Sequence, residues 1–184
     1  MTIDANGQPS ALYDNSGDGV TIDGLTITGV GGSDTGGTAP LVSQGGPVVA
    51  RNCTIVGNDA SNPDGNVAGA ILAEGGPVQV EHRTITDNTA SGDRGGVFGS
   101  DTAGAILSER GPISVTGSTI SRNTATSETS RSGGGVHSEG GNVSITDTTV
   151  DHNDATPGPG ELSAGGSLDL SGFRGRSPQA ARGS

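Results

Sequence analysis

Apolar and polar residues alternate in short runs along most of this chain, as expected for β-strands that bury one face. In residues 113–116, Ile113 and Val115 would point inward, and the two hydroxyl residues beside them outward. Glycine, asparagine or proline interrupts the alternation every few residues, which predicts tight corners between short strands. No stretch keeps a 3.6-residue period, so the pattern predicts essentially no helix.

One block of this alternating pattern occurs four times, and each copy ends in asparagine. The copies cover residues 44–58, 74–88, 109–123 and 139–153. Their last residues are 30, 35 and 30 positions apart, and no gap interrupts the shared block. A period of this size is typical of a solenoid, in which each unit buries its apolar face only against its neighbours.

Each repeat supplies three short strands separated by corners, enough for one coil of a triangular prism. Pro47, Pro77 and Pro112 belong at a corner, since proline lacks the N–H that a parallel ladder requires. The inward columns repeat from copy to copy: Val48, Val78, Ile113 and Val143; Ile55, Ile85, Ile120 and Val150; Ala60, Ala90, Ala125 and Ala155. The sequence therefore predicts an all-β fold, a parallel β-helix of about five to six coils.

The repeats lie near residues 20–28, 41–60, 71–90, 106–125 and 136–155, with a partial one at 162–171. We therefore expect a single β-helix domain over residues 1–171. Residues 172–184 carry no repeat, and we expect a frayed C-terminal tail there.

The closing asparagines require a separate explanation. Asparagine tolerates left-handed dihedral angles at a corner, and its amide can bond neighbouring backbone. Stacked at the strand spacing of about 4.8 Å, such amides can also bond one another along the axis. We therefore expect a structural ladder made of Asn58, Asn88, Asn123 and Asn153.

The repeat resembles that of a known group of proteins. The segment Gly104-Ala-Ile106, followed by Val115-Thr-Gly-Ser-Thr-Ile-Ser-Arg-Asn-Thr-Ala125, is similar to repeats of right-handed parallel β-helix proteins. These have the pectate-lyase-like superfamily fold and include many bacterial surface and polymorphic outer-membrane proteins. The resemblance covers roughly residues 20–155. It implies a right-handed helix and an extracellular or cell-surface location, but the fold hosts lyases, glycosidases, adhesins and passive stalks alike.

Composition narrows the interpretation further. Only 29% of the residues are apolar and 2% aromatic, which suits the thin core of a solenoid. The formal charge of −11 disfavours nucleic acid, which needs a basic surface. No apolar run reaches the ~20 residues of a membrane span, and residues 1–7 lack the features of a signal peptide. We expect either a cytosolic protein or, preferably, a fragment of a longer exported one.

Two groups of charged residues are candidates for chemistry. Glu74, Glu109 and Glu139 form a column whose carboxylates could bind calcium, the only cofactor that the sequence suggests. The alternative is a solvated corner where the side chains splay apart. In the second group, Glu81, His82 and Arg83 could supply acid–base chemistry, with irregular drift of one coil as the alternative.

The remaining candidates are isolated side chains. Phe98 lies in the longest inserted loop, where solenoids place binding function, and could stack on a sugar if exposed. Cys53 is the single cysteine, so an intrachain disulfide is impossible, and it is interpreted as a core residue.

Our leading functional hypothesis is a non-catalytic extracellular or cell-surface module, a stalk or adhesin-like spacer with weak carbohydrate binding. The alternative is a carbohydrate-active enzyme of the pectate-lyase-like class, a polysaccharide lyase or glycoside hydrolase acting on an acidic polysaccharide. A distant third hypothesis is ice binding, suggested by the outward Thr-x-Thr segments such as 26–28 and 84–86. The partners expected are a carbohydrate or a cell-surface protein, and a second copy through the open solenoid ends.

Overall fold

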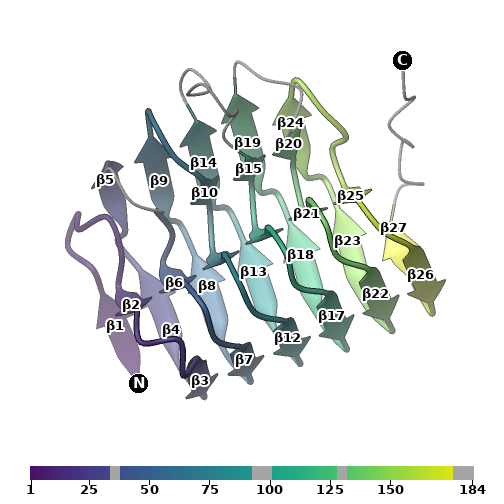
Figure 1. Cartoon of the computed structure of the whole chain (residues 1–184), viewed down its shortest axis with the longest axis horizontal. Coiled ribbons are helices and arrows are strands. Elements are labelled where there is room, and N and C mark those ends of the chain that lie inside the picture. Colours follow the sequence, from purple (N-terminus) through teal and green to yellow (C-terminus); the bar gives the residue numbers. More distant parts are fainter. Residues whose placement is uncertain (34–37, 93–100, 128–131, 176–184) are drawn as a thin grey trace.

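Strands that are one repeat apart in the sequence pair in parallel throughout the described chain, so the protein is a parallel β-helix (Figure 1). The computed structural model describes residues 1–33, 38–92, 101–127 and 132–175. These residues contain 27 strands and no helix. In the view of Figure 1 the coils succeed one another from the purple N-terminal end to the yellow C-terminal end.

The strands form five sheets, which we number I to V. Sheet I contains β1 (Thr2–Asp4), β4 (Thr26–Thr28), β8 (Thr54–Val56), β13 (Thr84–Thr86), β18 (Thr119–Ser121), β23 (Thr149–Asp151) and β27 (Arg174–Gly175). Sheet II contains β2 (Leu12–Asp14), β6 (Leu41–Ser43), β11 (Ile71–Ala73), β16 (Ile106–Ser108), β21 (Val136–Ser138) and β25 (Leu162–Ala164). Sheet III contains β3 (Val20–Asp23), β7 (Val48–Arg51), β12 (Val78–Glu81), β17 (Ile113–Thr116), β22 (Val143–Thr146) and β26 (Leu168–Ser171).

The two remaining sheets complete each coil. Sheet IV contains β5 (Gly31–Ser33), β9 (Asp59–Asn62), β14 (Thr89–Gly92), β19 (Thr124–Ser127) and β24 (Asp154–Thr156). Sheet V contains β10 (Val67–Ala68), β15 (Thr102–Ala103) and β20 (Ser132–Gly133). A full coil passes through sheets II, III, I, IV and V in that order.

A coil therefore has five short strands rather than the three that the sequence predicted. The three expected strands are those of sheets II, III and I. The strands of sheet IV are rich in small residues, and those of sheet V are only two residues long, so neither shows a clear alternation. The six strands of sheets II and III agree with the expected five to six coils.

The predicted inward columns form the core. The valine and isoleucine column of sheet III from Val48 to Val143 and the column of sheet I from Ile27 to Val150 are at most 1% exposed. Strand register stacks these residues directly on their counterparts in the next coil, for example Val78 on Ile113 and Ile85 on Ile120. Burial of such side chains stabilises a fold by roughly 1.5–3 kcal/mol each, which explains how a chain with few aromatics can fold.

The corner before sheet III contains the prolines, as expected. The carbonyl groups of Pro47, Pro77 and Pro112 accept hydrogen bonds from Val20, Val48 and Val78 of the preceding coil, at 2.8–2.9 Å. The proline contributes its acceptor, and its missing N–H falls outside the strand.

The last strand lies inside the segment 172–184, where we expected fraying. Arg174 and Gly175 pair with Thr149 and Val150 and so extend sheet I. The rest of that segment, residues 176–184, lies outside the described residues.

Candidate functional site

The four closing asparagines form a buried ladder along the axis, as the sequence predicted. Each Nδ2 donates to the Oδ1 of the next asparagine at 2.9 Å, from Asn58 to Asn88, from Asn88 to Asn123 and from Asn123 to Asn153. The same Oδ1 atoms also accept the backbone N–H of the asparagine in the preceding coil, at 3.0–3.2 Å. The side chains are 0–7% exposed, so their polar groups are used internally and offer nothing to a ligand.

Both ends of the ladder have partners of other kinds. Oδ1 of Asn58 accepts the backbone N–H of Val30 at 3.1 Å, and Nδ2 of Asn153 donates to the carboxylate of Glu161 at 2.8 Å. Left-handed backbone occurs at the residue before each asparagine, namely Gly57, Asp87, Arg122 and His152, with φ of +55° to +64°. The asparagine thus follows the corner, and its amide reaches into the coil interior.

The residues Glu81, His82 and Arg83 do not converge on one point. Glu81 lies on the outside and forms an ion pair with Arg51 of the preceding coil at 3.0 Å. His82 is exposed at a left-handed corner with φ of +53°. Arg83 is 3% exposed and points into the helix, in the column of Cys53 and its equivalents. The structure therefore separates the three groups onto different sides of the backbone.

Arg83 is a charged group inside the core. Its guanidinium donates to the backbone carbonyls of Ala50 and Ile22, while Nη1 has no hydrogen-bond partner. Burial lowers the pKa of this guanidinium, and the neighbouring Cys53 partly offsets the effect. Cys53 itself is 3% exposed, in agreement with its interpretation as a core residue.

Two earlier suggestions concern Phe98 and a bound metal ion. Phe98 lies in residues 93–100, outside the described part of the chain. Within the described ranges, no group of three or more His, Cys, Asp or Glu side chains is arranged to hold a metal ion. No helix in those ranges is long and apolar enough to cross a membrane.

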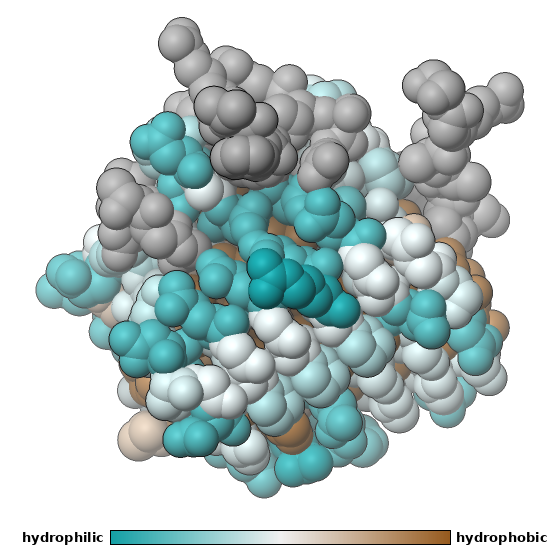
Figure 2. All heavy atoms as spheres, viewed as in Figure 1, coloured by the Kyte–Doolittle hydropathy of each residue, from teal (hydrophilic) through white to brown (hydrophobic). Residues whose placement is uncertain are grey.

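The glutamate column lies beside the corner where sheets V and II meet, and its Glu109 accepts a hydrogen bond from Asn66, which precedes sheet V. The bottom of this corner is formed by two facing ranks, which we call the floor: Val42, Leu72 and Leu107 on sheet II, and Ala39, Ala68 and Ala103 along sheet V. All six are fully buried and make up an apolar cluster separate from the main core. Figure 2 shows hydrophilic residues gathered across the middle of the visible face, with apolar atoms behind them.

His137 interrupts the sheet II rank of this floor. Strand register places it directly beside Leu107, where the previous coils have leucine or valine. Gly133 takes the corresponding place in the alanine rank, and a Cβ atom there would lie 3.1 Å from Cβ of His137. The imidazole therefore occupies the space that a smaller facing residue leaves.

Asp101 faces His137 across the corner. Oδ1 of Asp101 is 3.9 Å from Nε2 of His137, and the two residues are 2% and 7% exposed. Neither this oxygen nor either imidazole nitrogen has a hydrogen-bond partner. The backbone N–H of Asp101 donates to Oδ1 of Asn66 at 2.8 Å, and the Asn66 amide donates to Glu109.

Glu109 carries a strongly perturbed carboxyl group. Burial raises its pKa to about 7, and repulsion from Glu74, Asp101 and Glu139 acts in the same direction while Arg110 opposes it. Burial also raises the pKa of Glu74. A half-buried carboxyl group that titrates near neutrality can hold or release a proton under physiological conditions.

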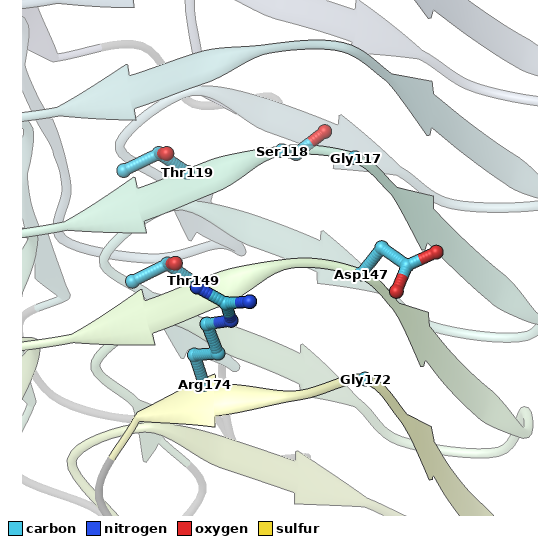
Figure 3. Close-up of a pocket in the computed structure, with 7 residues that line it drawn as sticks. All are labelled: Gly117, Ser118, Thr119, Asp147, Thr149, Gly172 and Arg174. Atoms are coloured by element: carbon cyan, nitrogen blue, oxygen red, sulfur yellow. The ribbon is translucent and has the colours of Figure 1, made fainter.

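A separate polar pocket of about 270 Å³ lies near the C-terminal end of sheet I (Figure 3). Figure 3 shows the hydroxyl residues Thr119 and Thr149 side by side, with Arg174 extending toward Thr149 and Asp147 at the corner. The lining residues are Gly117, Ser118, Thr119, Asp147, Thr149, Gly172 and Arg174. Hydroxyl, carboxylate and guanidinium groups without an aromatic ring can form hydrogen bonds to a sugar but offer it no stacking surface.

Sequence reasoning identified Glu109 but missed Asp101, His137 and Asn66. The available signal was the rank Val42, Leu72, Leu107, His137, in which a histidine replaces an aliphatic residue. The meaning of this histidine depends on the residues of sheet V that face it. The strands of sheet V are only two residues long, too short for the sequence to show which of their residues face sheet II. No protein-family model, curated protein or solved structure matches the chain, so the assignment of function depends on this geometry.

Proposed function

We propose that the chain is a non-catalytic β-helix module of an extracellular or cell-surface protein, a stalk or adhesin-like spacer. The observation that carries the proposal is the uninterrupted register. Strand pairing is the same on both sides of residues 93–100, where the repeat is longest. An insertion that leaves the ladder unchanged is what a scaffold tolerates, because only neighbouring coils contact each other.

Ion pairs between coils fit a structural role as well. Glu81 contacts Arg51 and Asp87 contacts Arg122, in each case one coil away, at 3.0 and 2.7 Å. Exposed pairs of this kind contribute at most about 1 kcal/mol, yet they join adjacent coils on the outside while the asparagine ladder joins them inside. The ion pairs and the asparagine ladder both join one coil to the next along the axis, and such contacts stiffen a solenoid.

Weak carbohydrate binding belongs to the same proposal, and the pocket beside Thr149 and Arg174 supports it. The resemblance of the repeats to those of right-handed, pectate-lyase-like surface proteins supports the location. The third hypothesis, ice binding, gains no support from the outward threonines, since Arg122 donates to Thr86 at 2.8 Å and leaves it 8% exposed.

A carbohydrate-active enzyme remains the second candidate, favoured by one observation, the titratable Glu109 near Asp101. General acid catalysis in glycoside cleavage requires such a carboxyl group together with a second one. The surrounding carboxylates would repel an acidic polysaccharide, which favours the spacer over a lyase of that class.

The deciding experiment is incubation of the purified chain with polygalacturonate and with neutral polysaccharides. We expect neither unsaturated product nor new reducing ends, and weak retention on some glycans that Arg174→Ala reduces. The matched control is Arg110→Ala, which removes the same charge outside the pocket. A product formed by the native chain and absent with Glu109→Gln would replace the spacer with the enzyme.

A further inference from the structure

One side-chain amide holds both ends of the segment that turns from sheet V into sheet II. Asn66 precedes β10, and its Oδ1 accepts the backbone N–H of Asp101 in the next coil at 2.8 Å. Its Nδ2 donates to the carboxyl group of Glu109, which follows β16 in that same coil. The buried residues Ala103 and Leu107 lie between these two contacts. Segment 101–109 is therefore fastened at both ends to one side chain of the preceding coil.

The contact at Glu109 involves a carboxyl group among other acids. Strand register stacks the residues just before Glu74, Glu109 and Glu139, so the three backbones succeed one another at the strand spacing of about 4.8 Å. The charged neighbours of Glu109 are Glu74, Asp101, Glu139 and Arg110. Burial raises the pKa of Glu109 to about 7, the three acidic neighbours act in the same direction, and the arginine opposes them.

This pKa determines which position of Glu109 each protonation state favours. A raised value means that the contact with Asn66 exists preferentially with the carboxyl group protonated. In water the carboxyl group would return toward its ordinary pKa of 4.5, so ionisation favours a position outside the corner. Glu109 is only half-buried, so rotation of its side chain brings the carboxylate into water without displacement of a strand.

We propose that Asn66 and Glu109 form a proton-controlled clamp on the corner where sheets V and II meet. With Glu109 protonated the clamp is closed, because the carbonyl oxygen of the carboxyl group still accepts from Nδ2 of Asn66. Loss of the proton releases Glu109 from its acidic neighbours. The amide of Asn66 is then held at one atom instead of two, so its bond to the N–H of Asp101 weakens as well. This device does not depend on the spacer role or on the carbohydrate pocket of sheet I.

His137 is a second titratable group close to this corner. Its Nε2 lies 3.9 Å from Oδ1 of Asp101, so a change in its charge would also be felt there. The experiment therefore includes His137→Leu, which removes the imidazole and leaves Asn66, Asp101 and Glu109 in place.

The test is a titration of the full chain between pH 5 and pH 9, followed by nuclear magnetic resonance at the backbone amide of Asp101 and the side-chain amide of Asn66. We expect both signals to shift together with a midpoint near pH 7. Glu109→Gln cannot ionise and abolishes the transition at both positions, whereas His137→Leu retains it. The matched control Glu81→Gln removes one negative charge outside the corner and leaves the midpoint unchanged.

Hydrogen exchange gives the direction of the change. From pH 6 to pH 8, exchange of the Asp101 N–H should accelerate more than that of Thr124, whose N–H donates to the backbone carbonyl of Asn88 at 2.9 Å. This comparison removes the general effect of pH on amide exchange. Equal acceleration, or slower exchange at Asp101 than at Thr124, would contradict release of the clamp at high pH.

Neighbouring charges should move the midpoint in known directions. Glu74→Gln removes a repulsive neighbour and lowers the midpoint by roughly half a pH unit or more, and Arg110→Ala raises it. A midpoint that neither variant moves would show that another group titrates. A transition that persists in Glu109→Gln or disappears in His137→Leu would likewise overturn the proposal, as would an Asp101 amide that stays constant from pH 5 to pH 9.

Discussion

Replacement of His137 by leucine tests whether the buried, unpaired imidazole lowers the stability of the fold. In the native chain the imidazole is 7% exposed and has two unpaired nitrogens, and it follows Val42, Leu72 and Leu107 in the sheet II rank. The variant His137→Leu completes that rank with the residue already found in the two preceding coils. We expect it to be more stable than the native chain.

The magnitude follows from three contributions. Removal of a buried unpaired polar group gains about 1–3 kcal/mol, and additional apolar burial adds up to about 1 kcal/mol. Because Gly133 faces this position in place of alanine, a void of about one methyl group remains and costs about 1 kcal/mol. The net gain is about 2 kcal/mol. For a chain of this length that raises the melting temperature by about 4–8 °C.

The assay is thermal unfolding followed by circular dichroism, with urea unfolding as a second measurement of the same difference. The matched control is Leu72→His, which introduces the reverse exchange into the same rank. It should cost about 3 kcal/mol or more, because it loses a fully buried leucine and buries an imidazole. A lower melting temperature of His137→Leu would refute the reasoning, since it would mean that His137 has stabilising partners.

Three further predictions concern other parts of the helix. Asn123→Ala breaks the ladder in the middle and leaves the side chain and backbone N–H of Asn88 without their acceptor. Urea unfolding should show that the free energy of unfolding falls by about 3–5 kcal/mol. The control Asn142→Ala, at an exposed asparagine, should lower it by less than about 1 kcal/mol. Arg83→Met replaces a desolvated charge with an apolar chain of similar length; the melting temperature should stay equal or rise, and a clear fall would show that the guanidinium bonds outweigh its burial cost. The pKa of Glu109 is raised from 4.5 to about 7, so the folded chain retains a proton that the unfolded chain has lost. Its contribution to stability is therefore greatest below about pH 4.5 and lost as the pH rises through about 7, and the native chain should lose more stability from pH 5 to pH 8 than Glu109→Gln does; equal losses would contradict the assignment.

The main features of the β-helix could be predicted because its determinants are local and repeat. Period-2 alternation shows which residues point inward, and the spacing of the repeats shows which residues stack. The ladder from Asn58 to Asn153 follows from the same two facts, because buried amides one coil apart have each other as nearest partners. The predicted coil was too simple in one respect: the strands of sheets IV and V are too short or too rich in small residues to alternate visibly.

The candidate site was predictable only in part. Glu109 was identified because glutamate recurs at the same position of successive repeats. Such a recurrence can be recognised in the sequence without a structure. Glu81, His82 and Arg83 were grouped because they are adjacent in the sequence, whereas the backbone directs the side chain of Arg83 into the core and leaves the other two outside.

The sequence by itself determined the solenoid, its inward columns and its axial ladder, because each depends only on alternation within a strand and on contact between adjacent coils. Only the tertiary structure decided which outward residues of sheet V and sheet II lie close together where the two sheets join. Asp101 precedes a strand of sheet V, and His137 lies in a strand of sheet II one coil further on. Their approach to 3.9 Å depends on the angle between those two sheets, and no periodic pattern of residues contains that angle.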